Sequence, residues 1–202
     1  MPTIYDVKPG FQALLRPLVR ILARRGVTAN QVTLAGVSLS LLTGAVVWSR
    51  PDLAAGLLLL PLVLLVRMAL NAIDGLLAKE HDMKTPLGAV LNELGDVISD
   101  AAVYLPMARV PGVRAWLVVL VVFLALLSEM AGVVAVQIGA SRRYDGPMGK
   151  SDRAFVFGVL YLLAGCGVGM GVWAQLILTL TVILLVLTII NRERLTLRKV
   201  TP

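Results

Sequence analysis

The sequence predicts an all-α, polytopic membrane protein with six transmembrane helices and an N-terminal amphipathic helix at the membrane interface. Composition, the length of the apolar runs and the distribution of basic residues lead to this prediction. Hydrophobic residues make up 58% of the 202 residues and charged residues only 15%, and the mean hydropathy is +0.86. Soluble domains are typically about half apolar and about a quarter charged, so a membrane protein is expected.

Six apolar runs are long enough to cross a bilayer as helices, since about 20 residues at about 1.5 Å each span a hydrocarbon core of about 30 Å. They cover residues 32–49, 53–79, 86–108, 113–141, 154–171 and 173–190. Thr28 or Asn30 is predicted to cap the first span, and Thr85, followed by Pro86, the third. No linker divides the chain. We therefore expect an N-terminal segment, residues 1–29, and one six-helix membrane domain, residues 30–202.

The N-terminal segment has the pattern of a helix that lies flat on a membrane. Phe11 and several leucines recur at helical spacing, while Arg16, Arg20 and Arg24 follow one another every four residues on another face. Such helices bury their apolar face in the interface and direct their basic face toward the headgroups. Pro17 predicts either a kink or the start of a second segment.

Basic residues are unevenly distributed between the two ends of the predicted spans. With six spans both termini lie on one side of the membrane, and nearly all Lys and Arg residues fall on that side. The positive-inside rule then predicts cytoplasmic termini in an inner or plasma membrane. Attraction to anionic lipids explains the net charge of +7, so no nucleic-acid partner is expected.

Polar side chains are concentrated in the second and third predicted spans. Asn71 and Asp74 share one helix face, and Asn92, Asp96 and Asp100 follow at intervals of four residues on another. Ionisable groups are costly inside a membrane and therefore indicate a functional site. Oxygen donors without nearby His or Cys favour Mg²⁺ or Mn²⁺ over zinc. The alternative is a structural role, in which these side chains hydrogen-bond the two spans together.

The order and spacing of these residues resemble the signature of the CDP-alcohol phosphatidyltransferases, D-x-x-D-G-x-x-A-R followed by G-x-x-x-D-x-x-x-D. The corresponding residues here are Asn71, Asp74, Gly75, Ala78, Lys79, Gly88, Asn92 and Asp96. The chain departs from the signature at three positions, because Asn71 and Asn92 replace aspartates and Lys79 replaces an arginine. The span count and the basic N-terminal helix also resemble that family.

Members of this family transfer a phosphatidyl group from CDP-diacylglycerol to an alcohol and release CMP. The resemblance implies that Asp96 is the general base, and that Asn71, Asp74, Asn92 and Asp96 hold a metal ion, with Asp100 as a further candidate. Positions that match or resemble nucleotide-contacting elements of the family are Asn30, Thr33, Gly75, Ala78, Lys79, Thr85 and Gly88. The resemblance also implies a homodimer, with CDP-diacylglycerol, a small polar alcohol and membrane lipids as partners.

The expected acceptor-binding residues lie in the basic segment 141–154, "SRRYDGPMGKSDRA", and at the end of the last span. Lys150 and Arg153 share a helix face, and Arg142 and Arg192 are further candidates. The resemblance implies a pocket for a phosphorylated polyol, such as glycerol 3-phosphate. Positive-inside topology alone is the alternative explanation of these charges.

Two other functions are compatible with the sequence. The two asparagines are also expected in a catalytically impaired relative that binds a CDP-lipid without turnover. An acidic cluster between helices is also found in cation transporters, although no internal repeat is detected here. Separately, Arg67 and Glu129 lie at similar depths in their spans and are expected to pair, with Asp100 able to share the arginine.

Overall fold

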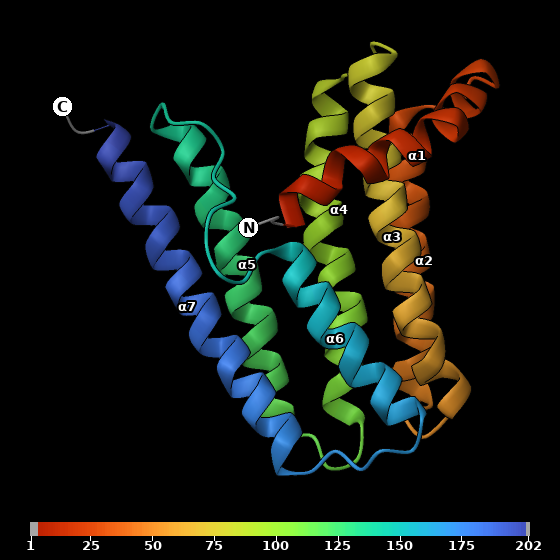
Figure 1. Cartoon of the computed structure of the whole chain (residues 1–202), viewed down its shortest axis with the longest axis vertical. Coiled ribbons are helices and arrows are strands. Elements are labelled where there is room, and N and C mark those ends of the chain that lie inside the picture. Colours follow the sequence, from red (N-terminus) through yellow and green to blue (C-terminus); the bar gives the residue numbers. More distant parts are fainter. Residues whose placement is uncertain (1–3, 201–202) are drawn as a thin grey trace. The chain divides into compact units, whose positions relative to one another are not determined.

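The computed structural model describes residues 4–200, and the side chains of residues 9–199, as an all-helical chain (Figure 1). Its helices are α1 (Ile4–Arg24), α2 (Ala29–Ser49), α3 (Ala54–Glu80), α4 (Pro86–Tyr104), the 3-10 helix η1 (Leu105–Arg109), α5 (Ala115–Gln137), α6 (Lys150–Gly165) and α7 (Val172–Val200). The predicted all-α fold class is confirmed.

Four helices in the described part of the chain are long and apolar enough to cross a membrane, namely α2, α3, α5 and α7. The predicted third span, α4, carries the carboxylates of Glu93, Asp96 and Asp100 within 19 residues. The predicted fifth span, α6, has only 16 residues. The four apolar helices are those of a membrane protein, while the count of six spans stays a prediction.

The chain folds into two compact units, and the divisions between them fall inside α2, α3 and α4. The first unit comprises Met1–Leu42 and Leu62–Ser99, and the second comprises Thr43–Pro61 and Asp100–Pro202.

In the first unit, α1 packs against the beginning of α2 and the end of α3. Their shared core consists of Val19, Ala29, Val32, Ile73, Leu76 and Leu77. The helix α1 continues through Pro17, and Gly26, at a φ of +74°, permits the tight turn into α2. Its position at a membrane interface stays a prediction.

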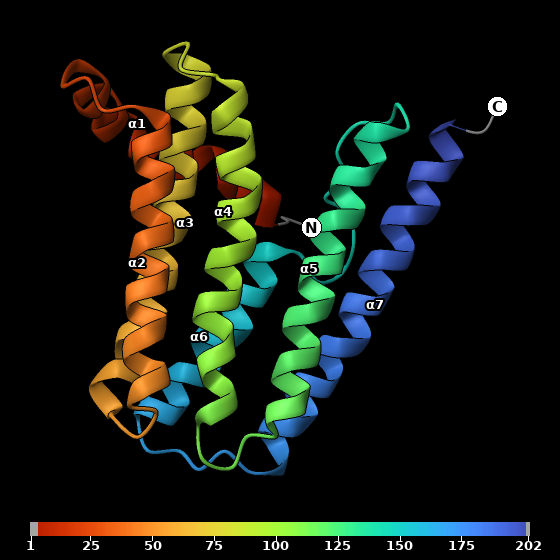
Figure 2. The ribbon, with the colours of Figure 1, turned by 180° about the vertical axis from the view of Figure 1, so that it is seen from behind.

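The helices α3 and α4 form an antiparallel hairpin in this unit, beside α2 (Figure 2). The hydroxyl of Thr85 accepts a hydrogen bond from the backbone N–H of Gly88 at 2.9 Å, which confirms Thr85 as the cap of α4. Thr28 caps α2 in the same way, through the N–H of Gln31 at 3.3 Å. Both helix starts therefore lie at the end of the unit where α3 finishes.

In the second unit, α5 packs against α7 and against η1. The rings of Tyr104 and Phe157 stack with centroids 4.2 Å apart, which joins α4 to α6. The buried hydroxyl of Tyr161 donates to the carbonyl oxygen of Val103 at 2.9 Å. A β-carbon on Gly44 would collide with the carbonyl oxygen of Ala102, so α2 and α4 approach each other backbone to backbone there.

Replacing Gly44 by alanine is expected to lower the free energy of unfolding by about 1–3 kcal/mol, because the backbone of α4 must move to admit the methyl group. Gly36→Ala is the matched control on the same helix, since its β-carbon would meet only the side chain of Leu70, at 3.7 Å. That variant should be neutral or stabilised by up to about 1 kcal/mol. Thermal unfolding in detergent measures both, and equal effects would contradict the close approach.

Candidate active site

The polar residues of the signature come together in the first unit, between α2, α3 and α4. The carboxylate of Asp74 on α3 is buried and accepts a hydrogen bond from the hydroxyl of Thr33 on α2, at 2.8 Å. Asn71, one turn earlier on α3, donates through Nδ2 to Oδ1 of Asp96 on α4, at 3.2 Å. Two side-chain contacts thus tie three helices together at the positions singled out by the sequence.

The remaining signature residues line the same helices. Asn92 is partly buried one turn before Asp96 on α4, and Lys79 is exposed at the end of α3. Ala78 packs against the core shared by α1, α2 and α3. At the helix starts, Asn30 donates through Nδ2 to the hydroxyl of Thr85 at 3.4 Å, which places these two expected nucleotide-binding residues side by side.

Two glycines of the signature have different surroundings. A β-carbon on Gly88 would come within 2.6 Å of Oδ1 of Asn30, so this glycine allows the starts of α2 and α4 to meet. A β-carbon on Gly75 would have no atom within 4 Å. Because Gly75 faces open space beside Asp74, a bulky ligand can approach the backbone of α3 there.

The donor set fits one hard divalent cation. Within residues 9–199 no group of three or more His, Cys, Asp or Glu side chains is placed to hold a metal ion. The site offers two carboxylates, Asp74 and Asp96, together with the amide oxygens of Asn71 and Asn92. Mg²⁺ is commonly bound by one or two carboxylates with the remaining ligands supplied by substrate phosphates and water, so this set is sufficient for a single ion.

The expected acceptor residues and Asp100 belong to the second unit, where Arg142, Arg153 and Arg192 form an ionic network with Asp100 and Glu129. Arg153 is fully buried and donates through Nη2 to Asp100 Oδ2 at 3.1 Å and to Glu129 Oε1 at 3.0 Å. Arg142 Nη2 pairs with Glu129 Oε2 at 3.2 Å. The predicted Arg67–Glu129 pair joins residues of different units and stays a prediction.

Arg192 also lies beside Glu129, and backbone carbonyl groups hold its guanidinium there. Its Nη1 donates to the carbonyl oxygen of Ser128, and its Nε donates to that of Asp145 at 3.1 Å. Lys150 stands partly buried in the first turn of α6. Sequence spacing placed Lys150 and Arg153 on one face, but it did not predict the burial of Arg153 or its two carboxylate partners.

Comparison with known proteins gives no matching family model. The chain is 48% identical over 194 residues to the inner membrane protein YnbA of Escherichia coli, covering 95% of each protein. It is 28% identical over 148 residues to the archaetidylinositol phosphate synthase of Pyrococcus horikoshii, covering 68% of this chain and 74% of that relative.

Solved structures with a similar fold include the Mycobacterium tuberculosis phosphatidylinositol phosphate synthase PgsA1. Its structure with CDP-DAG bound has a TM-score of 0.74 at 21% identity, covering 90% of this chain and 92% of the other. The same protein in complex with manganese and citrate has a TM-score of 0.73 at 22% identity, covering 89% and 87%.

The helical fold places the two halves of the polar signature on neighbouring helices, α3 and α4, in a chain whose described part has four helices apolar enough to cross a membrane. The chain shares its fold with the phosphatidylinositol phosphate synthase PgsA1 and is distantly similar in sequence to the archaetidylinositol phosphate synthase. Its similarity to YnbA extends over nearly the whole length, so the two proteins are members of one family.

Restoring the two missing aspartates with Asn71→Asp and Asn92→Asp is expected to lower the Mg²⁺ or Mn²⁺ concentration for half-saturation by at least about tenfold, because ligand charge sets affinity for hard cations. Bound metal stabilises the fold, so thermal unfolding during a metal titration measures this without an activity assay. Asn191→Asp, at an exposed position on α7, is the control for added charge. Identical half-saturation in the double variant and the unmodified protein would contradict the ligand positions.

Proposed function

We propose that this protein transfers a phosphatidyl group from CDP-diacylglycerol to a small alcohol and releases CMP. The observation that carries the proposal is the joining of the two halves of the signature by the hydrogen bond between Asn71 and Asp96, beside the buried Asp74. The PgsA1 structure with CDP-DAG bound, which shares the fold, supports CDP-diacylglycerol as the lipid substrate.

Asp96 serves as the general base in this proposal. The alcohol oxygen forms a bond to the phosphatidyl phosphorus, the bond from that phosphorus to the CMP oxygen breaks, and the hydroxyl proton passes to Asp96. Asn71 orients the Asp96 carboxylate through its 3.2 Å hydrogen bond, and Thr33 does the same for Asp74.

Asn71, Asp74, Asn92 and Asp96 would hold the Mg²⁺ or Mn²⁺ ion. A divalent cation bound there would neutralise the diphosphate of the substrate. The PgsA1 complex with manganese supports divalent-metal use in this fold.

The nucleotide end of CDP-diacylglycerol would lie against the ends of the three helices. Gly75 leaves open space there, and Lys79 supplies a positive charge at the end of α3. The paired side chains of Asn30 and Thr85 mark two helix starts, where backbone N–H groups favour phosphate oxygens.

The membrane arrangement follows the sequence predictions. We place the protein in an inner membrane, as the name of YnbA states for that relative, with both termini in the cytoplasm. Six spans, an interfacial α1 and a homodimer belong to the same proposal.

A phosphorylated polyol, with glycerol 3-phosphate as the first choice, is the proposed acceptor. The two relatives named as synthases are synthases of an inositol phosphate lipid, which favours an acceptor that carries its own phosphate. Lys150 and Arg153, which are three residues apart on α6, would bind the acceptor. Arg142 and Arg192 are further candidates, since they contact Glu129 together with Arg153.

Release of CMP from CDP-diacylglycerol in the presence of Mg²⁺ tests the reaction. Asp74→Asn and Asp96→Asn are expected to lower the rate at least about 100-fold, because a metal ligand or the base is lost. Asp52→Asn, at an exposed carboxylate outside the site, should retain full activity. Full activity of a correctly folded Asp96→Asn protein would refute the role of Asp96 as the general base. If the unmodified protein binds the lipid but releases no CMP, the protein is a catalytically impaired relative.

The acceptor hypothesis predicts different outcomes for two neighbouring cations. Lys150→Met should raise the KM for the acceptor at least about tenfold through loss of a charged contact, with little change in the KM for CDP-diacylglycerol. Arg153→Met should lower the free energy of unfolding by about 3–5 kcal/mol, because it leaves Asp100 and Glu129 without their shared cation.

Lys199→Met, at an exposed position near the end of α7, is the control for the loss of one positive charge. Equal changes in both KM values for Lys150→Met, or unchanged thermal unfolding of Arg153→Met, would contradict these assignments.

A further inference from the structure

The helix α1 has three distinct faces, separated by about 120° on an ideal helix. One face, with Val19, packs into the core of the first unit. A second face exposes Leu14, Leu18 and Ile21, of which Leu14 is 75% exposed. The third face carries Arg16, Arg20 and Arg24. The helix thus presents an apolar face and a basic face to its surroundings in addition to its buried face.

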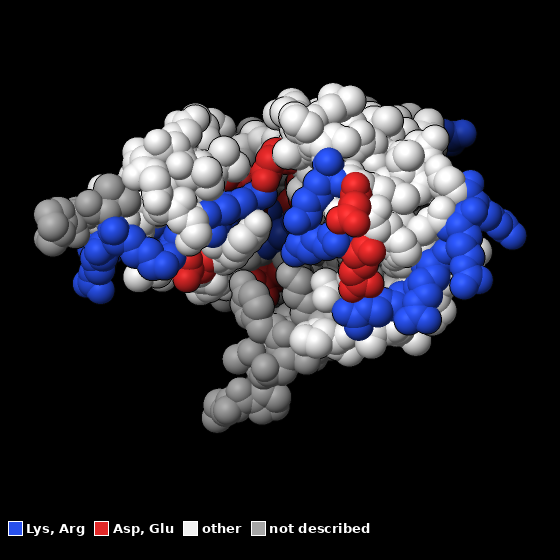
Figure 3. All heavy atoms as spheres, turned by 90° about the horizontal axis from the view of Figure 1, so that it is seen from above, with Lys and Arg blue, Asp and Glu red and all other residues white. Residues whose placement is uncertain are grey.

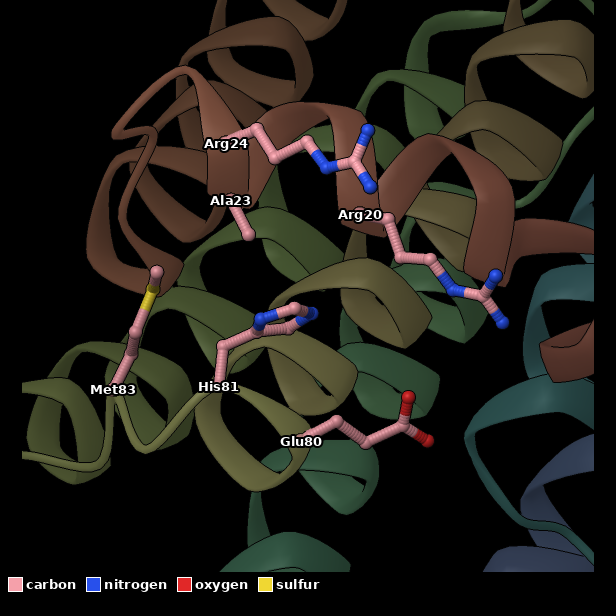
Figure 4. Close-up of a pocket in the computed structure, with 6 residues that line it drawn as sticks. All are labelled: Arg20, Ala23, Arg24, Glu80, His81 and Met83. Carbon is pink, nitrogen blue, oxygen red and sulfur yellow. The ribbon is translucent and has the colours of Figure 1, made fainter.

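A cleft of about 600 Å³ lies beneath the basic face, between α1 and the turn that joins α3 to α4. Its lining residues are Arg20, Ala23, Arg24, Glu80, His81 and Met83. Figure 4 shows Arg20 and Arg24 reaching from α1 on one side, with Glu80, His81 and Met83 on the other. The lining therefore combines two guanidinium groups, an imidazole and a carboxylate with two apolar side chains.

The charges in the cleft are not balanced internally. The Glu80 carboxylate is engaged by Arg16, whose Nε lies 3.0 Å from Oε1. Among the side chains of residues 9–199, Arg20 and Arg24 have no ion-pair or hydrogen-bond partner. Lys and Arg also cover more of the face viewed in Figure 3 than Asp and Glu do. The excess positive charge in the cleft favours the binding of an anion.

We propose that this cleft binds the phosphate group of an anionic phospholipid headgroup. The apolar face of α1 indicates the source of the phosphate, because Leu14, Leu18 and Ile21 are exposed where acyl chains would cover them. With that face in the acyl region, the basic face lies at the level of the headgroups. Ala23 and Met83 supply apolar contacts for the part of the lipid next to its phosphate. The proposal does not depend on the transferase activity.

Native mass spectrometry of the full chain in detergent, titrated with phosphatidylglycerol, tests the proposal. The unmodified protein should retain this lipid in preference to phosphatidylcholine with the same acyl chains. Each arginine near an anionic lipid strengthens binding by about fivefold, so the Arg20→Gln, Arg24→Gln double variant should bind about 30-fold more weakly. Arg20→Lys with Arg24→Lys keeps both charges and should retain most of the binding.

The matched control is Arg194→Gln with Arg198→Gln, which removes two exposed charges from α7 and should leave binding unchanged. An equal loss in both Gln double variants would show that total charge, rather than the cleft, retains the lipid. Equal retention of phosphatidylcholine would overturn the proposal. Displacement of the lipid by an equal concentration of inorganic phosphate would assign the cleft to a soluble anion instead.

Discussion

The cost of placing a charged group in an apolar environment governs the arrangement of the polar side chains in this protein. A carboxylate inside a membrane helix needs a hydrogen-bond donor, a cation or a metal ion. Asp74 receives the hydroxyl of Thr33, and Asp96 receives the amide of Asn71. These contacts also hold α2, α3 and α4 together. The hydrogen bonds that stabilise the two carboxylates therefore also position the candidate catalytic groups.

Buried carboxylates in the second unit also need partners, and there the partners are arginines. Glu129 lies close to three arginines, of which Arg153 also reaches Asp100. A planar guanidinium can donate to two carboxylates at once, whereas a lysine ammonium is a point charge, and this favours arginine at the buried centre of the network. The first unit thus gathers the oxygen atoms of Asp74 and Asp96 with those of asparagine side chains, whereas the second unit gathers arginines around Glu129.

The two asparagines of the signature change the charge of the site more than its shape. Asparagine is close to aspartate in size, so Asn71 can occupy the aspartate position and still contact Asp96 across the helix pair. The loss of two negative charges lowers the electrostatic attraction for cations and leaves Asp74 and Asp96 as the two carboxylates of the signature. The nitrogen of Asn71 also donates a hydrogen bond to Asp96, which an aspartate at that position could not do unless protonated.

Local patterns in the sequence determined the helices, the caps at Thr28 and Thr85, and the shared face of Asn71 and Asp74, because helical periodicity and capping act over a few residues. The metal-binding set that the resemblance implies has members on both α3 and α4, and it therefore required the polar faces of these helices to meet. Only the tertiary structure decided that Thr33 reaches Asp74 and that Arg153 is wholly buried between two carboxylates, since these contacts join residues 41, 53 and 24 positions apart. Contacts of that kind depend on how whole helices pack, and no short stretch of sequence encodes the packing.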